Sequence, residues 1–373
     1  MVRSIIRLVL IACMLTGCIE PYTFVIENNY PTLVVEGFIS DVSYNETVGY
    51  PSDGRYFTVI LRYTSDVSAT IDKLAENASV TLISDSGERW IYSQSPRKPG
   101  HYFLDNKDFK ARAGTEYKLQ ISLADGKSYE SGWEKLPENA TDAIGAIDFE
   151  ETSKQVYEVQ AGEEVVTTRK GINLRIDLPR REPGNTVYYR WKFEPTWIYV
   201  APLARSSQPD FRCWATSGNF LSGYALQADH TGGYKKDLFF MEVDGNERIF
   251  ERLSVLVNQY AMTEDHYYFW KEMQDQAEGG FIQDKPPYNL QTNIKAVDSD
   301  ERVSGYFGVV NEEAKRWYFS TKDLSYYVYD YLKEECLKPY GPPVRGEPNP
   351  CLSCLAYPHG SATNIKPSWW EGQ

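Results

Sequence analysis

Residues 113–121 have the sequence Ala-Gly-Thr-Glu-Tyr-Lys-Leu-Gln-Ile, and they carry the clearest strand pattern in the chain. Tyr117, Leu119 and Ile121 alternate with polar residues, as a β-strand with one buried face requires. Gly114 stands three residues before Tyr117, a spacing typical of the tyrosine corner in Greek-key β-sandwiches. The stretch therefore predicts a late strand of a β-sandwich.

The segments around this strand carry the same kind of pattern. Short runs of β-branched and aromatic residues alternate with turn residues such as Asp85-Ser86-Gly87 and Asp125-Gly126. The expected strands are residues 33–40, 56–63, 80–83, 90–92, 101–104 and 117–121, with another near Tyr129. About seven short strands at this spacing predict an immunoglobulin-like β-sandwich over residues 31–136.

A second, larger β-rich domain is expected over residues 141–373, after a linker near Pro137. Strands are expected at residues 172–178, 186–193, 197–200, 238–243, 249–258, 289–296, 303–310 and 316–320, with loops over 201–237. Thr263, followed by Glu264 and Asp265, predicts the start of an inserted helix near 263–278 that ends at Gly279-Gly280. A second, tyrosine-rich helix is expected at 324–335. The fold class is thus mostly β.

The first residues of the chain resemble a lipoprotein export signal. Arg3 and Arg7 precede an apolar run over residues 8–15, which is too short to span a bilayer, and Leu15-Thr16-Gly17-Cys18 has the form of a lipobox. We expect residues 1–17 to be a signal peptide, Cys18 to carry the lipid, and 18–30 to be a tether. The alternative is an ordinary cleaved signal with a chance cysteine.

The net negative charge of the chain disfavours anionic partners. The chain carries 39 basic and 52 acidic residues, a net charge of −13. Removing residues 1–17 takes away two arginines and makes the charge −15. Such an acidic body is a poor binder of nucleic acid and of anionic membrane surfaces, so a lipid would be the membrane attachment.

Four cysteines remain after residue 18, namely Cys213, Cys336, Cys351 and Cys354. An exported protein makes disulfides the expected state, and four cysteines allow three pairings. We favour Cys336–Cys351 with Cys213–Cys354, which would tie the C-terminal tail to the domain. A zinc site, using His230 or His359 as well, and redox chemistry at Cys351-x-x-Cys354 are the alternatives.

Aromatic residues make up 14% of the chain, with 28 Tyr and 9 Trp. Strands favour these residues, so most of them are expected in a β core. The alternative is a surface that stacks against a glycan or peptide, for which Trp197, Tyr199 and Trp214 are the candidates.

Catalytic motifs are weak or missing in the sequence. The four histidines form no His-Glu-x-x-His motif, no Gly-x-Ser-x-Gly elbow is present, and Gly126-Lys127-Ser128 lacks the earlier glycine of a phosphate-binding loop. His266 is expected at the surface or the edge of the core, in the first turn of the helix. Asp229, Asp237, Glu242 and Asp244 are expected on a solvated face. We therefore expect no enzyme, no catalytic residue, no metal and no cofactor.

Several short motifs together resemble a known family. They are Leu33-Val34-Val35-Glu36-Gly37, the run from Thr263 through Phe269-Trp270-Lys271, Gly279-Gly280-Phe281, Pro286-Pro287, Thr292-Asn293-Ile294, Gly305-Tyr306-Phe307-Gly308, and Cys351-x-x-Cys354 before Lys366-Pro367-Ser368-Trp369-Trp370. In this order they resemble the domain of unknown function 4249 lipoproteins of Bacteroidetes, over nearly the whole chain after the signal.

The resemblance implies an outer-membrane lipoprotein that accompanies a SusC-type TonB-dependent receptor in nutrient uptake or envelope transport. It implies no catalytic residue. Glu20, close behind Cys18, favours the cell surface over the periplasmic face. The other functions that stay open are a stand-alone glycan- or peptide-binding lipoprotein and an envelope enzyme.

Overall fold

The computed structural model describes residues 31–50, 52–64, 73–138, 143–160, 162–182, 184–278, 290–338 and 349–370. The expected signal peptide, Cys18, the tether and the end of the inserted helix at 279–280 lie outside these ranges. Within them, no helix has both the length and the apolar character needed to cross a bilayer.

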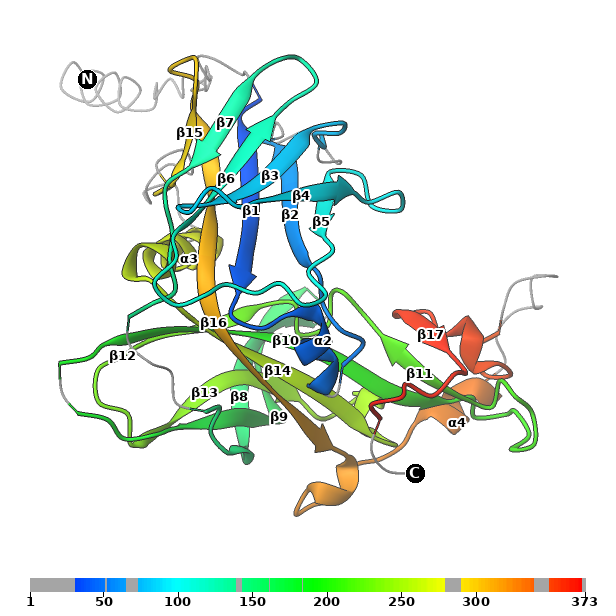
Figure 1. The fold of residues 1–373 in the computed structure, drawn as a ribbon. Helices are drawn as coiled ribbons and strands as arrows, with labels where there is room; N and C mark the ends of the chain where they lie inside the picture. Colours follow the sequence, from blue (N-terminus) through cyan, green and yellow to red (C-terminus); the bar gives the residue numbers. More distant parts are fainter. Residues whose placement is uncertain are drawn as a thin grey trace, which may run out of the picture.

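The chain is mostly β, as the sequence predicts, and its upper part in Figure 1 is a two-layered β unit. The strands run in the order β15-β7-β6-β3-β4-β5-β2-β1-β16, and the two halves of this path enclose one apolar core. The early elements are β1 (Leu33–Ser40), α2 (Tyr44–Gly49), β2 (Phe57–Tyr63), β3 (Ser79–Ser84), β4 (Arg89–Gln94), β5 (His101–Leu104), β6 (Tyr117–Ser122) and β7 (Ser128–Ser131).

The expected tyrosine corner is present in this unit. Tyr117 is buried, and its hydroxyl accepts a hydrogen bond of 3.0 Å from the backbone N–H of Arg112. The side chain thus ties the loop before β6 to the strand, which is the role that this motif plays in Greek-key sandwiches.

The lower part in Figure 1 consists of two packed sheets. One contains β8 (Ile147–Gln160), β9 (Glu163–Leu178) and β13 (Tyr234–Glu242). The other contains β10 (Val187–Val200), β11 (Arg212–Thr216), β12 (Tyr224–Asp229), β14 (Leu253–Met262), part of β16 (Val303–Phe319) and β17 (Ser361–Thr363). Buried residues such as Ile172, Trp191 and Val255 fill the space between them.

Strand β16 joins the two parts. Its residues 303–310 pair in parallel with β1, and its residues 311–319 pair antiparallel with β14. The short strand β15 (Ile294–Ala296) pairs with β7. The sequence predicts a self-contained sandwich over residues 31–136. The structure differs, because these residues alone do not complete the sandwich. Segments from more than 150 residues later complete it, because β1 needs a neighbour on its second edge.

The inserted helix is present as α3 (Glu264–Glu278). Tyr267, Phe269 and Trp270 pack it against Tyr306 of β16 and Leu226 of β12. The expected helix at 324–335 is wrong: only α4 (Leu332–Leu337) is helical. Leu324, Tyr326 and Val328 face the core while the residues between them face solvent, which is the two-residue period of an extended chain.

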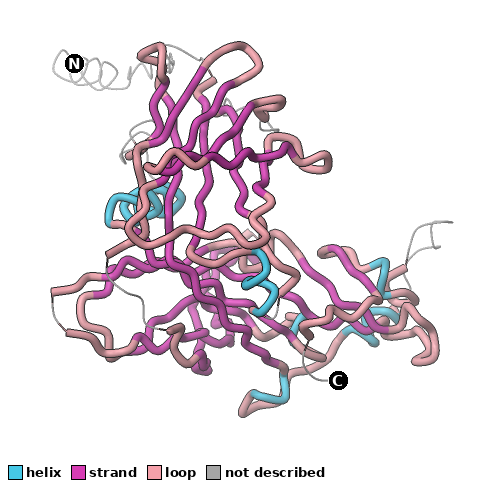
Figure 2. The backbone as a smooth tube through the Cα atoms, in the orientation of Figure 1, coloured by secondary structure: helices cyan, strands magenta, loops and turns pink. Residues whose placement is uncertain are grey.

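The region 201–237, expected to be loops, contains β11, β12 and the start of β13, and the strand β8 was not expected at all. Figure 2 shows that the lower part of the molecule consists largely of strands. Strand β8 contains five acidic or basic residues in its first twelve positions and so lacks the apolar alternation of the strands that were predicted.

Candidate functional site

A hollow lies between the two parts of the molecule. It is a cleft of about 430 Å³ whose walls come from the loop after α2, the middle of β10, the loop 216–222, the strands β14 and β16, and Trp369 of the tail. This volume lies within the range of small-molecule sites. We call this hollow the junction cleft.

Strand pairing sets the floor of the junction cleft. Glu194 of β10 is in register with Leu256 of β14, which is in register with Arg316 of β16. The three side chains therefore form one row across three strands. Their neighbours Val255, Val257 and Trp317 point to the opposite face and into the core.

The ladder along one edge of β10 is interrupted at the cleft. Pairing with β12 ends at Lys192 and pairing with β11 begins at Thr196, so residues 193–195 have no paired strand on this side. Pro195 has no N–H, which suits a strand position without a ladder partner. The loop 216–222 crosses beside this break and lines the cleft.

Glu194 is an exposed carboxylate inside the cleft. Its Oε1 accepts a hydrogen bond of 2.8 Å from Nδ2 of Asn258, which is nearly fully buried. Among the described residues, the carboxylate makes no ion pair. It is therefore oriented by the sheet and remains able to accept further hydrogen bonds.

An ion pair between a partly exposed arginine and a buried glutamate lies in one wall. Arg55 pairs with Glu312 of β16, and its guanidinium also lies over the rings of Phe38 and Tyr260. Burial alone would lower the pKa of Arg55, but the Glu312 carboxylate outweighs it and the pKa is raised. The pair joins the loop after α2 to the lower sheet.

The tail supplies another part of the wall. Trp369 donates a hydrogen bond of 2.9 Å from Nε1 to Oδ1 of Asp53, and the guanidinium carbon of Arg316 lies 3.5 Å from the centre of its ring. Burial lowers the pKa of Arg316 to about 10, so it stays charged at neutral pH. The indole is thus held from its edge and from one face.

A second hollow of about 680 Å³ adjoins the first. The loop 216–220 lines both, and the second is also walled by Arg248 and by residues 358–361. Leu221, in the same loop, has φ of +56°, a region that bulky side chains rarely occupy. Such strained positions cluster at binding and catalytic sites.

A buried aromatic group lies beneath α3, away from the cleft. His266 stacks flat on Tyr306 with ring centres 4.7 Å apart, and its Nε2 accepts a hydrogen bond of 3.0 Å from Trp270. Burial and the nearby Arg190 cation lower the pKa of His266 to about 3. The expectation of a surface or core-edge histidine is therefore wrong, because α3 packs its first turn against β16.

The hairpin of β8 and β9 extends beyond the sheet that it belongs to. Pairing of β9 with β13 ends at Gly171, so residues 152–160 and 163–170 form a two-stranded ribbon, which we call the arm. Tyr157 faces Val166 across the ribbon, and Val159 lies on the same side. These side chains are 82%, 54% and 71% exposed.

The apolar side of the arm continues the core-facing side of the sheet. Phe149, Leu174 and Ile176, nearer the body, occupy the same side of the hairpin and pack into the core. This side of the hairpin is therefore covered by the core near the body and is exposed to solvent in the arm.

The three stacking candidates do not form a surface. Trp197 and Tyr199 are buried in the core, at 0% and 5% exposure. Trp214 pairs with Ile198 and so points to the other side of the sheet, where its ring contacts that of Trp370. Alternation along the strand directs the rings of Trp197 and Tyr199 inward. The abundance of aromatic residues in the sequence could not indicate this.

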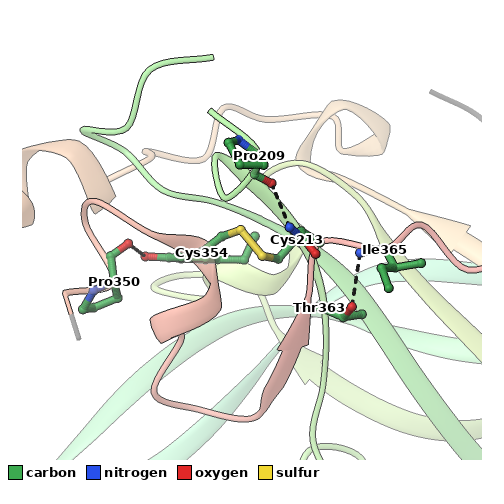
Figure 3. The surroundings of a disulfide bond; sticks show 8 residues. Pro209, Cys213, Pro350, Cys354, Thr363 and Ile365 are labelled. Atoms are coloured by element: carbon green, nitrogen blue, oxygen red, sulfur yellow. Dashed lines mark hydrogen bonds between the residues drawn. A yellow bond between two sulfur atoms is a disulfide. The ribbon is translucent and has the colours of Figure 1, made fainter. Parts of the chain in front are cut away.

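The cysteines form the favoured pairs. Cys213 of β11 bonds to Cys354, and Cys336 bonds to Cys351. Figure 3 shows the first bond beside Thr363 and Pro350, and the Pro350 carbonyl accepts a hydrogen bond from the Tyr199 hydroxyl. Because all four thiols are used, a zinc or redox site built on them is not formed. Among the described residues, no group of three metal-ligand side chains gathers.

Of the residues that line the junction cleft, only Trp369 was singled out from the sequence, as part of a motif. The lining comes from six separated segments, and no local pattern marks them. Pro195 and the glycines of 216–223 were the only signals, since they indicate a break in a strand and a turn.

Comparison with known proteins identifies the family. The sequence model described as "Domain of unknown function (DUF4249)" matches residues 19–316. No curated protein matches the chain. Trp369 lies in the tail, beyond the matched residues. So does the part of the second hollow that residues 358–361 line.

Proposed function

Because the chain belongs to the family of the domain of unknown function DUF4249, we propose that it is a lipid-anchored accessory protein of the outer membrane that docks on a SusC-type TonB-dependent receptor. The observation that supports docking is the apolar face of the arm. Contiguous exposed apolar side chains on a protein surface commonly mark an interaction site.

The arm has the form of a docking element. Its edges carry no described strand beyond Gly171, and Tyr157, Val159 and Val166 lie together on one side. Cover by a partner would remove these three side chains from water, and each buried apolar side chain contributes about 1.5–3 kcal/mol.

In this proposal the lipid is on Cys18 and holds the body beside its receptor. Acyl chains anchor strongly because each buried methylene adds about 0.8 kcal/mol. A tether also raises the effective concentration of the two partners without any new contact. The body then binds and positions, and it performs no turnover.

Affinity capture from native outer membranes tests the docking. The tagged full chain should recover a TonB-dependent receptor in stoichiometric amount, and Tyr157→Ser should recover much less. Ile91→Ser is the control, since Ile91 is 73% exposed and lies on β4 in the upper part of the molecule. Capture of no receptor after mild crosslinking, or equal capture by both variants, would contradict the proposal.

Cell fractionation tests the anchor. Cys18→Ala should move the chain from the outer-membrane fraction to the soluble fraction, and protease added to intact cells should cleave the wild-type body if it faces the surface. Retention of the variant in the membrane would exclude Cys18 as the attachment.

A further inference from the structure

The hydrogen-bonding groups along the interrupted edge of β10 in the junction cleft are mostly acceptors. Backbone groups of odd-numbered residues in β10 point toward the interrupted edge, as the bond of 2.9 Å from the Ala201 N–H to the Phe211 carbonyl shows. At the break they provide the carbonyls of Phe193 and Pro195 but only one N–H. The Glu194 carboxylate adds two more acceptor oxygens.

Hydroxyl groups complete this lining. Ser217 and Ser222 belong to the loop that crosses the break, and Thr196 lies at its end. A hydroxyl rotates to donate or to accept, so it adapts to the ligand. A ligand that suits this surface carries several O–H or N–H donors.

Charge then selects among ligands rich in donors. Arg55 and Arg316 line the cleft, but Glu312 neutralises Arg55, so Arg316 is the guanidinium that opposes a cationic ligand such as an amine. Glu194 and Asp53 repel an anion in the same way. A neutral ligand meets neither penalty.

Aromatic rings give the cleft its apolar walls. Phe220, Trp369 and Tyr50 line it. Trp369 is held by its hydrogen bond to Asp53, so its ring loses little freedom when a ligand binds. Rings beside acceptor groups suit a molecule with C–H faces and hydroxyl edges.

From these features together we propose that the junction cleft binds a neutral carbohydrate, with Glu194 accepting hydrogen bonds from its hydroxyls. A peptide fits less well, since its backbone brings as many carbonyl acceptors as N–H donors. This proposal concerns a site separate from the arm, so either proposal can fail alone.

Titration calorimetry with the full chain tests the site. The probes are maltose, cellobiose, lactose and mannobiose as neutral sugars, spermidine as a cation and galacturonate as an anion. At least one neutral sugar should bind, and Glu194→Gln should weaken it by about tenfold or more, because a hydrogen bond to a carboxylate is stronger than one to an amide.

Two further variants make the test specific. Glu251→Gln is the control, since Glu251 is an exposed carboxylate outside the cleft whose nearest cation is Arg212 at 3.9 Å, and it should bind as wild type does. Ser222→Trp should block the cleft and abolish binding. Tyr157→Ser in the arm should leave sugar binding unchanged.

Several results would overturn the proposal. They are binding of spermidine or galacturonate in place of every neutral sugar, absence of binding to any neutral sugar at millimolar concentration, and equal affinities of wild type, Glu194→Gln and Ser222→Trp. Near-ultraviolet circular dichroism of each variant confirms that its fold is retained.

Discussion

Gly308 lies where strand β16 passes directly against the ring of His266. A Cβ added at residue 308 would overlap Cε1 and Nδ1 of that ring. The ring cannot move away easily, because it is stacked on Tyr306 and bonded to Trp270. Gly308→Ala should therefore lower the free energy of unfolding by about 1–3 kcal/mol, as overpacking of a core does.

Urea denaturation followed by tryptophan fluorescence measures this loss. Gly49→Ala is the matched control, since a Cβ there meets no atom within 4 Å. An unchanged midpoint for Gly308→Ala would mean that α3 can shift away from β16 at little cost.

Glu134 is a half-buried carboxylate that accepts hydrogen bonds from the Tyr306 hydroxyl at 2.8 Å and from Asn293 at 2.9 Å. Burial raises its pKa, and the two hydrogen bonds oppose this only in part. A raised pKa in the folded state means that stability is greatest below the unfolded pKa, near 4.3, and falls as pH rises through the folded pKa.

Glu134→Gln keeps an acceptor oxygen and cannot ionise. The variant should therefore gain stability relative to wild type as pH is raised from about 4 to about 8, the side of the unfolded pKa on which the carboxylate is charged. Urea midpoints at a series of pH values test this, with the exposed Glu116→Gln as control. A constant difference between Glu134→Gln and wild type would show that burial does not govern this carboxyl.

Among the elements, the strands with clear alternation could be predicted from the sequence. β1 coincides with the expected strand at 33–40, and β6 lies at the expected strand 117–121. α3 could be predicted as well, because Thr263, Glu264 and Asp265 mark its start. β8 and the segment 324–330 could not, since a charged strand and an aromatic extended chain lack distinctive local patterns.

The junction cleft could not be predicted for a different reason. Its floor exists only through the register of three strands, which brings Glu194 and Arg316 into one row although more than 100 residues separate them. No local pattern determines such pairing. The favoured cysteine pairs are confirmed, although the sequence left three pairings open.

The two disulfides close loops of very different length. Cys336–Cys351 spans 15 residues, and Cys213–Cys354 spans 141. If restriction of the unfolded chain dominates, replacing both cysteines of the short loop by alanine should cost about 3 kcal/mol, and of the long loop about 5 kcal/mol. Guanidinium denaturation of the two double variants checks the order, and a larger loss from the short loop would point to folded-state effects instead.

At the scale of the whole molecule, β16 makes the two parts depend on each other. Phe307 and Val309 of this strand, with Ile294 of β15, are buried in the core of the N-terminal unit. Each contributes about 1.5–3 kcal/mol through burial, and a domain is stable by only about 5–15 kcal/mol in total. Without them β1 would also present a free edge of eight residues.

A fragment of residues 31–138 should therefore remain unfolded or aggregate, although it contains seven strands of the unit. A second fragment, in which residues 290–312 follow residue 138 through a Gly/Ser linker, restores β15 and the paired part of β16 and should fold. Near-ultraviolet circular dichroism and urea denaturation of both fragments decide the matter. Cooperative unfolding of the short fragment would mean that β16 is an addition to a sandwich that is already complete.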